Sequence, residues 1–214
     1  MFFTLNYVNS QYMSESEIQM LFPTPIYRNR LTLESHHKLK NIMFDYDTQD
    51  NKGNKSSKNH YVLNNKDLKG VKKLLEFYLQ DYFDQIIQTK NKVKPYITQS
   101  WFNYTNKEEN HHMHSHQNSH LSGVLYVEAD ETDCITFHRR TDNGFKFEPK
   151  DYNPFNCITN TVPVRGGDVL IFPSTMVHSV PTRFKGEEPR VSIAFNTWVK
   201  GTLGDNDNMT ELKI

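Results

Sequence analysis

The chain of 214 residues is long enough for one domain, and its 25 basic and 25 acidic residues give a formal net charge of zero. A balanced charge lacks the basic footprint of a dedicated nucleic-acid-binding protein, and no apolar run approaches the roughly 20 residues that a membrane helix needs. The two cysteines form no CxxC pattern and the first residues do not resemble a secretory signal, so we expect free thiols and a cytoplasmic protein.

The first 95 residues carry extended and helical signals, and we interpret 1–95 as an extended segment and helices that pack on a later β core. Two prolines exclude a helix in 21–31. A helix is expected over 32–44, followed by a polar, exposed loop over 47–60 that shows no hydrophobic period. The clearest helix is predicted over 66–88, because apolar residues recur there at spacings of three and four.

From about residue 96, short β-rich runs alternate with Gly, Asn, Asp and Pro breaks. The eight runs span 96–104, 121–128, 134–139, 144–148, 157–165, 167–174, 177–183 and 190–199. This spacing predicts a mainly β, double-sheet jelly roll with the N-terminal helices packed on one sheet. We assign 96–200 to the β core and 201–214 to a polar tail.

Five histidines lie close together in the segment NHHMHSHQNSH: His111, His112, His114, His116 and His120. Side chains two apart on a strand point to one face, so His114 and His116 could reach one ion. Neutral imidazoles suit Fe, Zn, Cu or Ni, and their affinity for metal should fall as the pH drops through about 6.5. The alternative is an exposed, histidine-rich loop without a functional metal.

A third ligand is expected from the segment VRGGDVLIFPSTMVH, where His178 follows a glycine turn and an apolar strand. A barrel that brings this strand beside the first would place His178 next to His114 and His116. Further along, Arg190 and Ser192 alternate on one face of a strand. A buried guanidinium needs an anion and grips a carboxylate through two hydrogen bonds, so a dicarboxylate would fit between the metal and Arg190. The alternative is a surface arginine paired with a nearby glutamate.

At these residues the sequence resembles the Fe(II)/2-oxoglutarate-dependent dioxygenase superfamily, and more narrowly the 2OG-Fe(II) oxygenases found in many phages and marine bacteria. The segments that carry the resemblance are LFPTPI, the W-x-N of Trp101 and Asn103, HSHQNSHLSGVLYV, GDVLIFPSTMVH and RVSIAFN. The resemblance implies a double-stranded β-helix fold, Fe(II), O₂, and 2-oxoglutarate that becomes succinate and CO₂ while a substrate C–H bond is hydroxylated. By the same resemblance, His114 and His178 are iron ligands. Arg190 with Ser192 anchors the distal carboxylate of 2-oxoglutarate, and Asn103 is a polar contact to it.

One position departs from the family pattern, which is His-x-Asp or His-x-Glu followed by a distal histidine. Here the second position is His116, so the centre either uses three histidines or takes a carboxylate such as Asp130 from elsewhere, unless the register is His112-x-His114. We expect His114, His116 and His178 as ligands. Without a carboxylate the site is one unit more positive, which should change its redox potential.

The sequence therefore predicts a dioxygenase with a small-molecule or peptidyl substrate, and neither a membrane nor nucleic acid as a partner. Four aromatic residues are candidates for the pocket wall: Phe102, Tyr104, Tyr126 and Trp198. Two alternatives use the same fold. One is a cupin-like metalloprotein without redox chemistry, such as an isomerase or small-molecule binding module, and the other is a structural jelly roll with a vestigial site.

Overall fold

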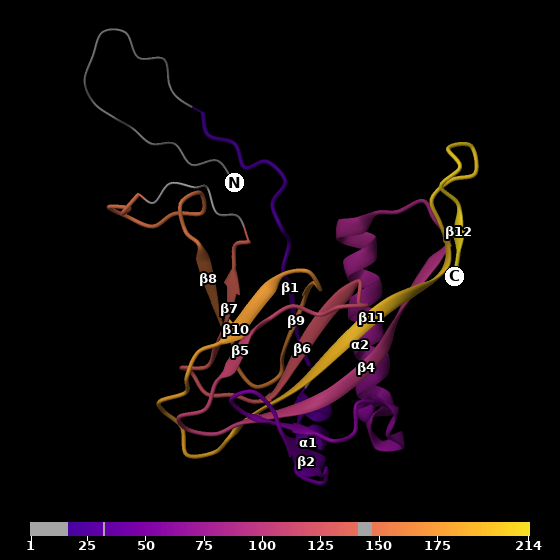
Figure 1. Ribbon diagram of the computed structural model, residues 1–214. Coiled ribbons are helices and arrows are strands. Elements are labelled where there is room, and N and C mark those ends of the chain that lie inside the picture. Colours follow the sequence, from indigo (N-terminus) through magenta and orange to yellow (C-terminus); the bar gives the residue numbers. More distant parts are fainter. Residues whose placement is uncertain (1–16, 32, 141–146) are drawn as a thin grey trace, which may run out of the picture.

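The computed structural model describes residues 17–31, 33–140 and 147–214, which form two antiparallel sheets with helices near the N-terminus (Figure 1). The expected mainly β fold is confirmed. The large sheet has the order β1 (Tyr27–Arg30), β9 (Asp168–Pro173), β6 (Leu121–Glu128), β11 (Arg190–Leu203), β4 (Val93–Thr105), β3 (Lys55–Ser57) and β2 (Thr48–Asp50), and β12 (Leu212–Lys213) pairs with β11. The small sheet has the order β5 (His111–His114), β10 (Val177–Val180), β7 (Cys134–His138) and β8 (Thr159–Pro163). None of the helices in the described ranges is long and apolar enough to cross a membrane.

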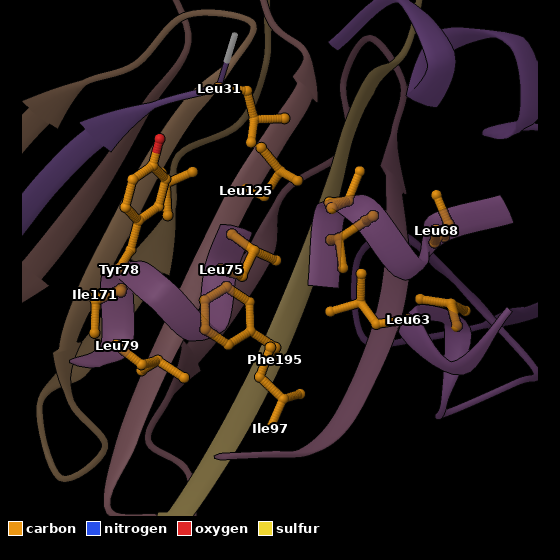
Figure 2. Close-up of a cluster of buried hydrophobic side chains, with 14 of the residues drawn as sticks. Leu31, Leu63, Leu68, Leu75, Tyr78, Leu79, Ile97, Leu125, Ile171 and Phe195 are labelled. Carbon is orange, nitrogen blue, oxygen red and sulfur yellow. The ribbon is translucent and has the colours of Figure 1, made fainter. Parts of the chain in front are cut away.

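The helical elements cover the outer face of the large sheet, the face turned away from the small sheet. They are α1 (Leu33–Ile42), the 3₁₀ turns η1 (Val62–Asn64) and η2 (Lys66–Leu68), α2 (Lys69–Tyr82) and the π-helical turn η3 (Phe83–Ile87). Leu75 and Leu79 of α2 are fully buried against Phe195 and other sheet residues (Figure 2). Burying one such leucine contributes about 1.5–3 kcal/mol, so this contact is a main source of stability.

Side chains along β11 alternate between the two faces of the sheet. One set packs in the helix-covered core, and the other faces the interior between the two sheets. Val191, Ile193 and Phe195 belong to the core under the helices. Arg190, Ser192 and Ala194 point the other way and line a cavity, as period-two geometry requires. A second, smaller apolar cluster packs between the sheets and consists of Tyr126, Ile135, Phe137, Val164, Leu170 and Phe172.

Two segments differ from the sequence-based expectation, and for a third the structure provides no test. The predicted exposed loop over 47–60 contains the hairpin of β2 and β3, closed by a turn in which Gly53 has a φ of +93°. The predicted polar tail is paired, because β11 continues to Leu203 and β12 folds back on it. Most of the run expected over 144–148 lies outside the described residues. Both polar hairpins depend on backbone hydrogen bonds, which leave no apolar period in the sequence.

Candidate metal centre

Three of the predicted ligands, His114, His116 and His178, lie together where β5 and β10 pair. His114 is directly opposite His178 in the register of these strands, and their ring centroids are 4.3 Å apart. The ring of His116 is 5.0 Å from that of His114 and 5.3 Å from that of His178. One side-chain nitrogen from each of the three lies within 4.8 Å of the others, so one ion could contact all three. We call these residues the inner triad.

Backbone carbonyls fix which ring nitrogen His114 and His178 can offer. Nδ1 of His114 is 2.8 Å from the carbonyl oxygen of His112, and Nδ1 of His178 is 3.0 Å from that of Met176. A carbonyl oxygen only accepts hydrogen bonds, so both Nδ1 atoms carry the proton. Nε2 of each ring is then left with its lone pair, which is the form that binds a metal.

The pKa values of all three histidines in the inner triad are lowered, so the imidazoles stay neutral at pH values where free histidine takes up a proton. Burial, followed by the neighbouring His114, lowers the pKa of His178 to about 3 and that of His116 to about 4. Burial also lowers the pKa of His114. Protons should therefore begin to compete with a metal below the 6.5 of free imidazole, the value that the sequence alone had suggested.

A narrow cavity connects the inner triad to Arg190. Its volume is about 30 Å³, which exceeds the roughly 10–15 Å³ that one buried water needs. The cavity lining includes Asn103 and Ser192, which face each other on β4 and β11, and Tyr126 of β6. All three of the residues predicted to hold a dicarboxylate (Asn103, Arg190 and Ser192) are therefore on one cavity with the histidines.

Arg190 is a buried cation, with only 2% of its surface exposed. Its Nη2 donates a hydrogen bond of 3.1 Å to Oγ1 of Thr105, and no carboxylate in the described ranges forms an ion pair with it. Within the same ranges, Nε of Arg190 and Oδ1 of Asn103 are buried without a hydrogen-bond partner. Burial lowers the pKa of Arg190, although a guanidinium still keeps its proton in proteins. Such a charge is costly unless an anion joins it.

The structure removes one alternative for the metal ligands and shows a second group of histidines. Asp130 pairs with Arg183 at 2.9 Å and is outside the histidine groups, so it does not supply the missing carboxylate. His111, His112 and His114 form a second group whose ligand atoms also lie within 4.8 Å of one another. We call it the outer triad. Of its two additional residues only His111 lines the narrow cavity, where burial lowers its pKa to about 3.

A larger cavity of about 370 Å³ opens on the other side of the histidines. It shares Trp101, His111, His114 and His116 with the narrow cavity. Its remaining lining comes from β4, from β5 and from the β2–β3 hairpin and the loop after it: Gln49, Asn51, Ser56, His60, Gln99 and His112. Sequence reasoning missed this wall because it assigned 47–60 to an exposed loop.

The predicted aromatic wall is only partly correct. Tyr126 lines the narrow cavity, whereas Phe102 and Tyr104 belong to the core under the helices, and Trp198 is 40% exposed on the far part of β11. Trp101, a position of the family resemblance, is the aromatic residue that contacts both cavities. His120, the fifth histidine of the sequence cluster, is exposed and its ring lies 5.7 Å from that of Phe83, outside both triads.

Comparison with known proteins agrees with this arrangement. Residues 99–196 match the family model described as "Putative 2OG-Fe(II) oxygenase", and no curated protein matches the chain. A 2OG-Fe(II) oxygenase family oxidoreductase from Burkholderia pseudomallei is 12% identical, with 77% of this chain and 78% of that chain covered and a TM-score of 0.55. HygX from Streptomyces hygroscopicus, solved with nickel, 2-oxoglutarate and hygromycin B, is 12% identical, with coverages of 81% and 82% and a TM-score of 0.58.

A prolyl-4-hydroxylase from Pseudomonas putida is 11% identical, with coverages of 81% and 92% and a TM-score of 0.53. At these identities the three structures show a common fold and nothing finer. The matched segment 99–196 runs from β4 into β11 and contains the inner triad together with Arg190. Over residues 99–196 the chain is therefore similar to the 2OG-Fe(II) oxygenase family.

Proposed function

We propose that the protein is an Fe(II)- and 2-oxoglutarate-dependent dioxygenase that hydroxylates a substrate and releases succinate and CO₂. In this proposal His114, His116 and His178 bind the iron. The cosubstrate is held by Arg190, Ser192 and Asn103. The observation that carries the proposal is a buried guanidinium without an anionic partner among the described residues, facing the same cavity as three neutral imidazoles.

The residues present fit both groups by their chemistry. Three imidazole nitrogens suit a first-row transition metal such as iron. The unpartnered Nε of Arg190 is a donor for a carboxylate, and the neighbouring Ser192 hydroxyl can add a second hydrogen bond. HygX, which shares the fold, was solved with nickel and 2-oxoglutarate bound, and this supports the pairing of the two groups.

Iron with 2-oxoglutarate, when bound, would supply the oxidising chemistry. The protein would bind and orient the metal and the cosubstrate and exclude water from them. His114 and His178 present Nε2 because backbone carbonyls hold Nδ1–H. Arg190 and Ser192 would orient the distal carboxylate from the floor of β11, while Val124, Tyr126 and Ile135 keep the inner end of the cavity apolar. His116 brings no negative charge, so the anion that joins Arg190 is the main compensation for the local positive charge.

Succinate formation tests this proposal. Protein supplied with Fe(II), ascorbate and O₂ should convert 2-oxoglutarate to succinate, at least slowly and without a substrate, as measured by ¹H NMR. Arg190→Ala should abolish the reaction, whereas Arg140→Ala, at an exposed arginine outside both cavities, should not. Equal succinate from both variants would refute the role of Arg190.

Metal binding can be measured apart from turnover. The chain has two tryptophans, Trp101 and Trp198, and only Trp101 lies near the inner triad, 5.8 Å between ring centroids from His116. In a Trp198→Phe protein, Cu(II) or Ni(II) should quench the remaining emission at one equivalent, and His178→Ala should prevent this. A metal site without any succinate would favour the second candidate function, a cupin-like metalloprotein without redox chemistry. The absence of a carboxylate from the inner triad is the observation that favours it.

A further inference from the structure

We infer, on the basis of the proposed function, that the 370 Å³ cavity is the substrate pocket and that its substrate is a neutral saccharide or glycoside. The cavity meets the inner triad at His114 and His116, on the opposite side from Arg190. A molecule bound there would therefore lie beside the metal without displacing a diacid from Arg190.

The cavity is built on the same sheet face as the cosubstrate site. Gln49 pairs with Ser56, Ser56 with Asn103 and Asn103 with Ser192, across the neighbouring strands β2, β3, β4 and β11. Directly paired residues project to one face of a sheet, so these four side chains form a continuous polar row. Asn103 and Ser192 belong to the narrow cavity, and Gln49 and Ser56 to the larger one.

The lining of the larger cavity is polar but carries no formally charged side chain. Among its lining residues in the described ranges there is no Asp, Glu, Lys or Arg, although these types make up 23% of the chain. A cationic substrate would lose water here beside the positively charged metal, and an anionic one would find no Lys or Arg side chain to pair with. A purely apolar substrate would leave the amide of Gln99 without a partner among the described residues and that of Gln49 with only its contact to His60. A neutral, hydrogen-bonding substrate satisfies both conditions.

Two further features favour a sugar ring among neutral polar molecules. The amides of Gln49 and Gln99 both donate and accept, as sugar hydroxyls do, and Ser56 adds a hydroxyl of the same kind. Trp101 lines the cavity, and its ring centroid is 6.4 Å from that of His60 and 5.8 Å from that of His116. The negative face of an indole attracts the weakly positive C–H bonds on the flat side of a pyranose. The pocket thus combines an aromatic surface with surrounding amides.

A single-tryptophan protein tests this inference without requiring catalysis. Trp198→Phe leaves Trp101 as the only indole, and Zn(II) can occupy the metal site without quenching it. Titration with methyl glycosides of glucose, galactose and mannose, with sucrose and with trehalose should produce a saturable change in emission for at least one of them. In Trp101→Phe protein the same sugar should leave the emission of Trp198 unchanged.

Amide variants then locate the sugar. Gln49→Ala and Gln99→Ala should each weaken binding about three- to tenfold, the effect of one neutral hydrogen bond. Gln85→Ala, an exposed glutamine on η3, is the matched control and should not change the affinity. Unchanged affinity in both pocket variants would overturn the inference.

Charged and peptidic probes test whether the pocket prefers a substrate other than a neutral sugar. Tighter binding of glucose 6-phosphate, gluconate or an N-acetyl dipeptide amide than of any neutral sugar would overturn the saccharide assignment. Absence of any sugar response in protein that still binds 2-oxoglutarate would overturn it as well and leave the proposed function intact. Sugar binding in protein that neither binds nor consumes 2-oxoglutarate would instead contradict the proposed function and, with it, the assignment of this sugar as a substrate.

Discussion

Replacing Arg190 by methionine should make the ligand-free protein more stable while it removes 2-oxoglutarate binding. The guanidinium is 2% exposed, has one hydrogen bond to Thr105 and forms no ion pair within the described ranges. Removing a buried ion of this kind is worth several kcal/mol, because its desolvation is no longer required. Losing the charge-assisted bond to Thr105 takes back about 1.5–3 kcal/mol. Arg190→Met should therefore stabilise the ligand-free fold by about 1–3 kcal/mol.

Thermal unfolding measures both halves of this prediction. For a domain of this size 1 kcal/mol corresponds to about 2–4 °C in Tm, so Arg190→Met should unfold about 2–12 °C higher than the wild type without ligand. Added 2-oxoglutarate should raise the Tm of the metal-loaded wild type and not that of the variant, because losing one partner of a buried charge pair costs about 2–5 kcal/mol, or roughly 30- to several thousand-fold in Kd. Arg140→Met, at an exposed position, controls for the loss of a positive charge.

A lower Tm for ligand-free Arg190→Met would refute this reasoning, since it would mean that the guanidinium already has a strong partner in the free protein. An equal rise in Tm with 2-oxoglutarate in the variant and the wild type would show that the diacid binds elsewhere.

The remaining predictions concern the metal, pH and packing. His112→Ala should leave metal stoichiometry by isothermal titration at one per chain, because the outer triad shares His114 with the inner one and a second ion should not bind beside the first. Metal-free protein should lose stability as the pH falls from 6.5 toward 4, because the unfolded chain takes up protons that His178, with a folded pKa of about 3, does not. The loss should be about 2 kcal/mol at pH 5 for this histidine, and urea unfolding that shows no loss would contradict the neutral inner triad. Gly123→Ala should destabilise the fold by about 1–3 kcal/mol in the same assay, because its Cβ would lie 2.1 Å from the Phe195 ring, and an unchanged midpoint would show that this ring can move.

The sequence predicted the parts of the site that depend on residue type and local spacing. The alternation of Arg190 and Ser192 placed both on one strand face, and the structure puts both on the narrow cavity. The pairing of His178 with His114 is different, because strand register across a barrel leaves no local signal. There the family resemblance supplied the expectation that the geometry of β5 and β10 now supports.

His111 was overlooked as a lining residue for a definite geometric reason. In a regular strand, residues three apart point to opposite faces. Between β5 and β10, however, His114 pairs with His178 while His111 pairs with Val180, so three residues on one strand span two on the other. This bulge turns His111 onto the face of His114. The assignment of Phe102 and Tyr104 to the pocket wall was an avoidable error. Both residues flank Asn103 on β4, and the neighbours of an inward-facing residue on a strand must face outward.

The same strands that carry the site also anchor the core, and this explains how the fold tolerates an unpaired cation. On β11, Val191 and Ile193 are fully buried against the helical side, one residue away on either side of Ser192. Each such side chain contributes about 1.5–3 kcal/mol, so a few of them offset the desolvation of Arg190 on the opposite face. The backbone that holds Arg190 and Ser192 is therefore fixed by contacts that a ligand does not touch. A diacid can relieve the buried charge without a change in the helix-covered core, which is what a preformed site on a rigid sheet requires.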